Sequence, residues 1–201
     1  MKSTFERFGA YCAILGGIAG FLYSLSFIFL KNDVLSAVFL LLGGFFTTAA
    51  IVALYEQLRA TDAPFAIWGF LLVVVGALGS ITHGGYDLSN ALHPPATINA
   101  DLPNPIDPRG LLTFGLTGIG LFVLSWLMSR NESFPGTLAY LGYLSALLMI
   151  IVYLGRLIIL QASSLVIAIP ALLEGFIVNP VWYIWLGLVL MRDRPVPKVR
   201  R

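Results

Sequence analysis

Six mainly apolar runs separated by short polar segments make up most of this sequence. They cover about residues 8–30, 34–55, 65–92, 110–129, 136–160 and 168–191. Each run is close to the roughly 20 residues that an α-helix needs to cross a bilayer. Because lipid offers no partners to backbone polar groups, spanning segments must satisfy them internally, as helices do. The pattern therefore predicts an all-α, polytopic integral membrane bundle of six transmembrane helices that forms a single domain over residues 1–201.

Local signals predict where some of these helices begin, bend or end. Ser3 and Glu6 have the spacing of a capping box, which places a helix start just before the first run. That run exceeds the h-region of a cleaved signal peptide, about 7–15 residues, so we expect it to remain as a span. Pro180 has no N–H to donate and predicts a kink in the sixth span. Residues 93–109 hold five prolines, so no regular helix is expected there.

Composition supports the membrane class. The chain is 58% hydrophobic and 11% charged, whereas ordinary soluble domains are roughly 25% charged. The net charge of +2 includes no polybasic segment, so we expect no nucleic-acid partner. The single cysteine, Cys12, cannot form an internal disulfide and is expected to be a small buried side chain.

The basic residues predict an orientation. Nine of the twelve Lys and Arg residues fall on the side that carries the termini: Lys2, Arg7, Arg59, Arg130, Arg192, Arg194, Lys198, Arg200 and Arg201. The opposite side has Lys31, Arg109 and Arg156. Because Lys and Arg concentrate in cytoplasmic loops, we expect both termini in the cytoplasm of a cell-membrane protein. The proline-rich loop of residues 93–109 would then lie outside.

A polar stripe at the end of the third span is the most informative feature. Ser80, His83, Asp87 and Asn90 are spaced three, four and three residues apart, which places them on one helix face. Four polar side chains facing lipid would lose their hydrogen bonds. We therefore predict that they line a cavity beneath the 93–109 loop. In that position His83 could hydrogen-bond Asp87, and the alternative is that Asp87 is a water-exposed cap at the membrane interface.

Two charged residues in other spans are predicted to lie near the same leaflet. Arg156 is close to the end of the fifth span, and Glu174 lies in the first half of the sixth. A charged side chain inside the hydrocarbon costs several kcal/mol, roughly 2.5–3.5 on insertion scales. We therefore expect the two residues to form an ion pair that joins these spans. The alternatives are that Arg156 extends to the outer headgroups, or that the two residues bind a ligand. The candidate ligand-binding residues are Ser80, His83, Asp87, Asn90, Arg156 and Glu174.

Three functions fit this pattern. The first is binding or transport of a lipid-like or small amphipathic molecule, with Arg156 available for an anionic head. The second is a membrane-embedded enzyme that uses His83 and Asp87 as a general-base pair, with metal assistance if His93 and Glu174 join them. The third is a structural or signalling subunit that forms homo- or hetero-oligomers through small-residue helix faces such as Gly16 and Gly20. No sequence motif identifies a cofactor.

One short segment resembles a known group of proteins. The pattern from Glu174-Gly175-Phe176 through Asn179-Pro180 to Trp182 and Trp185-Leu186-Gly187 is similar to the last span of small six-span bacterial membrane proteins of unknown function. The resemblance covers about twenty residues and implies the six-span fold but no activity.

Overall fold

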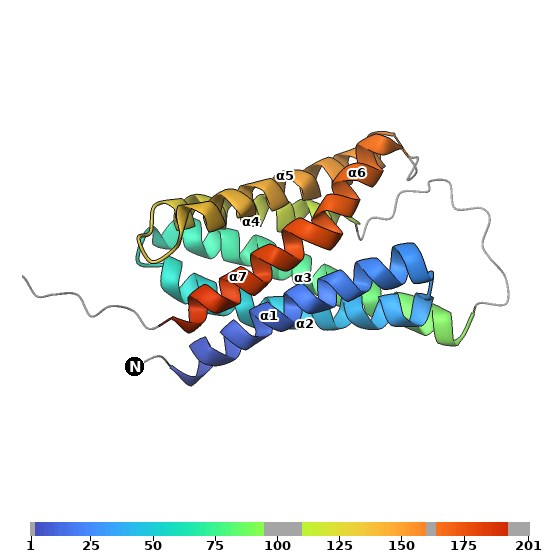
Figure 1. Ribbon diagram of the computed structural model, residues 1–201, viewed down its shortest axis with the longest axis horizontal. Coiled ribbons are helices and arrows are strands. Elements are labelled where there is room, and N and C mark those ends of the chain that lie inside the picture. The colour runs from blue at the N-terminus through green and yellow to red at the C-terminus, as the bar shows by residue number, and fades with distance from the viewer. Residues whose placement is uncertain (1–2, 95–109, 160–163, 193–201) are drawn as a thin grey trace, which may run out of the picture.

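The computed structural model describes residues 3–94, 110–159 and 164–192, and the regular elements in these ranges are helices (Figure 1). They are α1 (Thr4–Ser24), η1 (Leu25–Leu30), α2 (Asp33–Leu58), α3 (Ala63–Leu92), η2 (Leu111–Leu116), α4 (Thr117–Ser129), α5 (Gly136–Ile158), α6 (Leu165–Leu173), η3 (Glu174–Val178) and α7 (Asn179–Met191). The segments labelled η are π-helical and continue the adjoining α-helices. Six continuous helices result, each long and apolar enough to cross a membrane. The predicted all-α six-helix bundle is confirmed, and the chain is a multi-pass membrane protein.

Side chains cap the first three helices. The Ser3 hydroxyl accepts a hydrogen bond from the Glu6 N–H at 3.1 Å, and a Glu6 carboxylate oxygen accepts one from the Ser3 N–H at 2.8 Å. The predicted capping box is therefore present. Asn32 and Asp62 cap α2 and α3 in the same way, through their side-chain oxygens. These caps satisfy N–H groups that have no partner within a helix.

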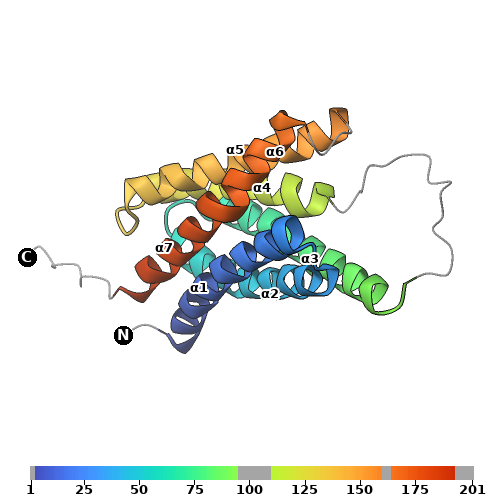
Figure 2. The same cartoon turned by 45° about the vertical axis from the view of Figure 1, so that its right-hand side comes forward.

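The six spans form a closed ring in chain order. Each span packs on the next, and α7 of the sixth span packs on α1 of the first. Figures 1 and 2 show the start of α1, the end of α7 and the turns after α2 and α4 at one end of the bundle, here called the terminal end. The opposite end, where α3 finishes and η2 begins, is called the loop end.

The half of the bundle at the terminal end is a packed core. Its buried side chains come from all the spans and include Leu54, Leu124, Leu138 and Trp182, which are fully buried. Since lipid supplies no hydrophobic force between helices, close packing of this kind must hold the spans together. The Asn131 side chain adds a hydrogen bond of 2.9 Å to Thr61, which joins the two turns at this end.

The loop-end half departs from regular α-helix. Within the described ranges it contains the three π-helical segments, one each in the first, fourth and sixth spans. Pro180 is the second residue of α7 and comes two residues after the end of η3. A π-helix, in which the turn widens to admit an extra residue, therefore lies just before the proline at which a kink was predicted. The segments η1 and η2 have no proline in them or directly after them, and sequence analysis did not predict them.

Candidate functional site

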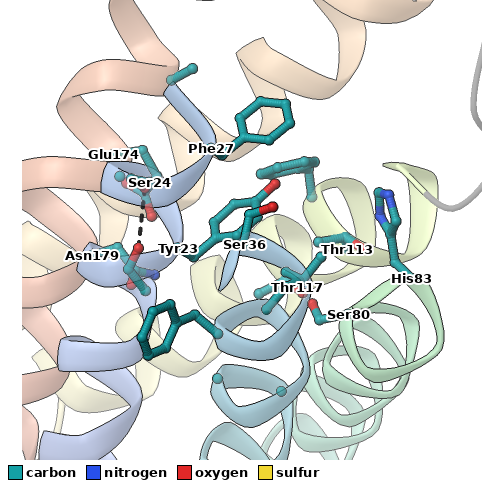
Figure 3. A pocket seen from close by; sticks show the side chains of 18 of the residues that line it. Tyr23, Ser24, Phe27, Ser36, Ser80, His83, Thr113, Thr117, Glu174 and Asn179 are labelled. Atoms are coloured by element: carbon teal, nitrogen blue, oxygen red, sulfur yellow. Dashed lines mark hydrogen bonds between the residues drawn. The ribbon is translucent and has the colours of Figure 1, made fainter. Parts of the chain in front are cut away.

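The loop-end half of the ring encloses a cavity of about 620 Å³ (Figure 3). Residues from all six spans line it, and each of the three π-helical segments contributes to its wall. This volume lies within the range of small-molecule sites, about 300–1,000 Å³. The two halves of the bundle therefore differ: the half at the terminal end is packed, and the half at the loop end contains a cavity large enough for a small molecule.

The structure brings all six predicted site residues to this one cavity. Ser80, His83, Asp87 and Asn90 approach it from α3, Arg156 from α5, and Glu174 from η3. Their common location follows from the ring, because the end of α3, the end of α5 and the start of the sixth span are all at the loop end. Whether they bind a ligand stays a prediction. The predicted lid falls largely outside the described residues, which include only His93 and Pro94 of that segment.

The histidine and the aspartate of the polar stripe contact each other. The His83 Nε2 atom lies 3.1 Å from the Asp87 Oδ2 atom, one helical turn away. The His83 side chain is 16% exposed and the Asp87 side chain 39%, so the imidazole is the deeper of the two. The predicted pairing is confirmed. In such a pair the carboxylate fixes the orientation of the imidazole ring.

A glycine next to His83 allows α3 to approach α2 closely. A Cβ atom added to Gly84 would lie 2.7 Å from the Ala37 carbonyl oxygen and 2.7 Å from the Leu41 nitrogen. The neighbouring Gly85 has no atom within 4 Å of such a Cβ. Gly84 of α3 is thus one point at which the two backbones meet, and Gly44 of α2 is another, since a Cβ added there would lie 2.8 Å from the Ala77 carbonyl oxygen. These contacts hold α3 in the rotation that presents the polar stripe to the cavity.

Glu174 is the most deeply buried charged residue of the cavity. Its exposed fraction is 5%, and its Oε1 atom accepts a hydrogen bond of 2.5 Å from the Ser145 hydroxyl on α5. Its Oε2 atom is buried and has no hydrogen-bond partner. In Figure 3, Glu174 lies beside Ser24 and above Asn179, on the wall opposite His83. The deep part of the cavity therefore presents a carboxyl group with one oxygen available.

The predicted ion pair between Arg156 and Glu174 is wrong. Within the described ranges, the ion pairs closer than 4.0 Å are Glu56–Arg59 and His83–Asp87. The physical reason is depth. Ser145 contacts Glu174, and Arg156 lies eleven residues further along α5, a rise of about 16 Å. Arg156 is therefore an exposed residue near the mouth of the cavity, whereas Glu174 lies deep inside.

Several hydroxyl groups of the cavity were not predicted as site residues. They belong to Tyr23, Ser24, Ser36, Thr113 and Thr117. Ser24 donates to the Gly20 carbonyl at 3.1 Å, whereas the buried Thr113 hydroxyl has no partner. A signal was present in the sequence, since these residues all fall in the loop-end halves of their spans. Single serines and threonines are common in membrane helices, however, and do not by themselves indicate a cavity.

The titratable side chains of the lining are mainly acidic. Three carboxyl groups, from Asp33, Asp87 and Glu174, share the cavity with one guanidinium, from Arg156, and one imidazole, from His83. Aromatic rings form much of the remaining wall, among them Phe27, Phe39, Phe114 and Tyr183. No group of three His, Cys, Asp or Glu side chains suited to a metal ion occurs among the residues that the structure describes. Cys12 is buried, as expected.

Comparisons with protein-family models, curated proteins and solved structures found no match. The resemblance of the last span to six-span bacterial membrane proteins therefore stays a prediction. The site itself is the basis for inferring function.

Proposed function

We propose that the protein binds or transports a lipid-like or small amphipathic molecule in the loop-end cavity. The observation that supports this most directly is that six polar or charged residues from three different spans line one space of about 620 Å³. Ionisable side chains within membrane spans are costly and usually mark a substrate or ion pathway. A bundle that only had to be stable would gain more from packing this half as tightly as the other half.

The distribution of side chains fits a molecule with one polar and one apolar part. Glu174, His83 and the hydroxyl groups can hydrogen-bond a polar head, and the phenylalanine rings offer apolar contact area. Known small-molecule sites have this character, with mostly apolar walls and a few placed polar groups.

The proposal includes an orientation. We place the protein in the cell membrane with both termini in the cytoplasm, so that the cavity opens to the outside. The unequal distribution of Lys and Arg supports this, and the arrangement of the ring is consistent with it, because the start of α1, the end of α7 and the turns after α2 and α4 share the terminal end. A ligand would then enter from the outer leaflet or from the external solution.

Mass spectrometry of the purified protein tests the proposal. The protein would be released from native membranes in a mild detergent, and retained molecules would be identified and quantified. Gly43→Leu fills the cavity, because Gly43 lines it and an added Cβ would meet only the Ala19 Cβ, at 3.7 Å. Gly136→Leu is the matched control, since Gly136 lies outside the cavity at the start of α5, with open space around an added Cβ.

The expected result is an amphipathic molecule retained by the wild type and by Gly136→Leu but lost from Gly43→Leu. Equal retention by all three proteins would show that the molecule binds elsewhere. Wild-type protein that retains nothing, but copurifies with a partner chain, would favour a structural or signalling subunit.

A second candidate function is supported by the His83–Asp87 contact. An imidazole oriented by a carboxylate is a common arrangement for a general base. The His83 Nε2 and Asp87 Oδ2 atoms are 3.1 Å apart, which is a hydrogen-bonding distance. A membrane-embedded enzyme would use this pair on a substrate in the cavity. Consumption of a retained molecule by the wild type, but not by His83→Ala, would support this function over simple binding.

A further inference from the structure

We propose that the molecule bound in the cavity carries a positive charge, and that Glu174 binds this charge. This inference rests on the proposed function, since it names the class of ligand for the same cavity. The candidates are amines and lipophilic organic cations.

The first argument is the unpaired oxygen of Glu174. The residue is 5% exposed, and of its two carboxyl oxygens only Oε1 has a hydrogen-bond partner, the Ser145 hydroxyl. Oε2 is buried without one. A buried carboxylate is stable only if it is paired or fully hydrogen-bonded. A cation in the cavity would provide the interaction that the protein itself does not supply.

The second argument is that no Arg or Lys side chain among the described residues pairs with Glu174. Within those ranges, Arg156 is the one Arg or Lys residue of the lining, and it is exposed near the mouth of the cavity. The groups that lie around the carboxyl are neutral: Ser145 from α5, Ser24 from α1 and Asn179 from α7. The site is therefore built to hydrogen-bond a carboxylate while leaving its charge uncompensated.

The third argument comes from the rest of the wall. Asp33 and Asp87 lie with Arg156 toward the loop end, so the route to Glu174 carries more negative than positive charge. Such a route raises the local concentration of cations. The aromatic rings of Tyr23, Phe27 and Tyr183 also line the cavity, and aromatic faces attract cations, most strongly where water is excluded.

The alternative is that the cavity binds an anionic ligand. Arg156 could meet an anionic head near the mouth, but a molecule that reached deeper would bring its negative charge toward Glu174. Like charges at this depth repel strongly because the effective dielectric constant is low. The cavity as a whole therefore favours a cation.

A matched pair of ions tests the proposal. Tetraphenylphosphonium and tetraphenylborate have nearly the same size and shape and opposite charges. Binding of each would be measured by equilibrium dialysis against the protein in nanodiscs of zwitterionic phosphatidylcholine, with empty nanodiscs subtracted. The expected result is that the wild type retains the phosphonium ion with about tenfold or higher affinity than the borate ion, because the Glu174 carboxylate attracts the cation and repels the anion where the effective dielectric constant is low.

The variants assign the preference to one residue. Glu174→Gln keeps the size of the side chain and removes its charge, and it should lose about tenfold or more of the phosphonium affinity because the Coulomb attraction is lost. Glu174→Asp keeps the charge and should retain most of the preference for the cation. Glu132→Gln is the control, because Glu132 is exposed in the turn between α4 and α5 at the terminal end, and it should bind like the wild type.

The outcomes separate the two proposals. Retention of the borate ion but not of the phosphonium ion would overturn the cationic ligand while leaving a binding cavity in place. Retention of neither ion would count against the binding function as well. Equal phosphonium affinity of the wild type and Glu174→Gln would overturn the role of Glu174. The charge preference of the wild type remains decisive even if a variant fails to fold.

Discussion

The Ser145 hydroxyl on α5 donates a hydrogen bond to the Glu174 carboxyl on η3, and the two residues are 0% and 5% exposed. This contact joins the fifth and sixth spans at the deep end of the cavity, close to the packed core. It also leaves the second carboxylate oxygen, Oε2, without a partner. One hydrogen bond thus contributes both to the stability of the bundle and to the chemistry offered to a ligand.

Ser145→Ala should destabilise the protein. The substitution removes the hydrogen bond that the Glu174 Oε1 atom accepts from Ser145. A buried acceptor without a partner costs about 1–3 kcal/mol of stability. Ser129→Ala is the control, because the Ser129 hydroxyl is exposed and donates to the Trp126 carbonyl of its own helix. Unfolding in mixed detergent, followed by circular dichroism, measures both. Equal stability of Ser145→Ala and the wild type would contradict the importance of this contact.

Gly84→Ala should lower the stability of the folded protein, whereas Gly85→Ala should raise it. At Gly84 the added methyl group meets backbone atoms of α2 at 2.7 Å, so α3 must move, at a cost of about 1–3 kcal/mol. At Gly85 it enters open space, and the better helix propensity of alanine should stabilise by up to about 1 kcal/mol. The same unfolding assay distinguishes them. Two equally destabilised variants would mean that the approach of α3 to α2 is not as close as described.

Cysteine labelling should report the orientation of the protein. In a Cys12→Ala background, Pro94→Cys places a thiol at the loop end and Glu132→Cys places one at the terminal end, both at exposed positions. On intact cells, a membrane-impermeant maleimide should modify the first and spare the second; permeabilised cells, in which both should react, provide the control. Labelling of the second alone would reverse the orientation, and the cavity would then open to the cytoplasm.

Removal of a retained ligand should lower the stability of the wild type. A ligand that binds only the folded state stabilises it by about 2.7 kcal/mol when its free concentration is about 100 times its Kd. Exchange into ligand-free detergent should therefore lower the Tm of the wild type and of Gly136→Leu. It should leave the Tm of Gly43→Leu unchanged, because the cavity is already filled. A similar drop in all three proteins would point to loss of bulk lipid instead.

Much of the architecture could be predicted from the sequence because membrane spans are determined by local composition. The apolar runs set the lengths of the six helices, and the spacing of Ser80, His83, Asp87 and Asn90 defined a face of α3. Such features depend on one helix at a time. The structure adds that this face and the candidate residues of the fifth and sixth spans line a single cavity.

The contacts between helices could not be predicted in the same way. Arg156 and Glu174 share a half of the bundle, but Arg156 is two residues from the end of α5, whereas Glu174 lies nine residues into the sixth span, about 14 Å from its start. The sequence places these opposite charges in the same half of the bundle and so suggested an ion pair. The two side chains lie at different depths along the bundle axis, however, and are too far apart to form one. The contact of Ser145 with Glu174 depends on how α5 is rotated against η3, which neither segment encodes alone. The π-helices η1 and η2 likewise lack a local signal such as proline.

The border between the packed half and the hollow half has a consequence for how sequence change acts on this protein. All three π-helical segments lie on the hollow side of that border, so each of the first, fourth and sixth spans changes its helical geometry where packing gives way to the cavity. Substitutions on the packed side should alter the amount of protein that reaches the membrane. Those on the hollow side should alter which molecules it holds. A collection of variants sorted separately by yield and by ligand preference should divide at the three π-helical segments, and ligand preference can then diverge without loss of the fold.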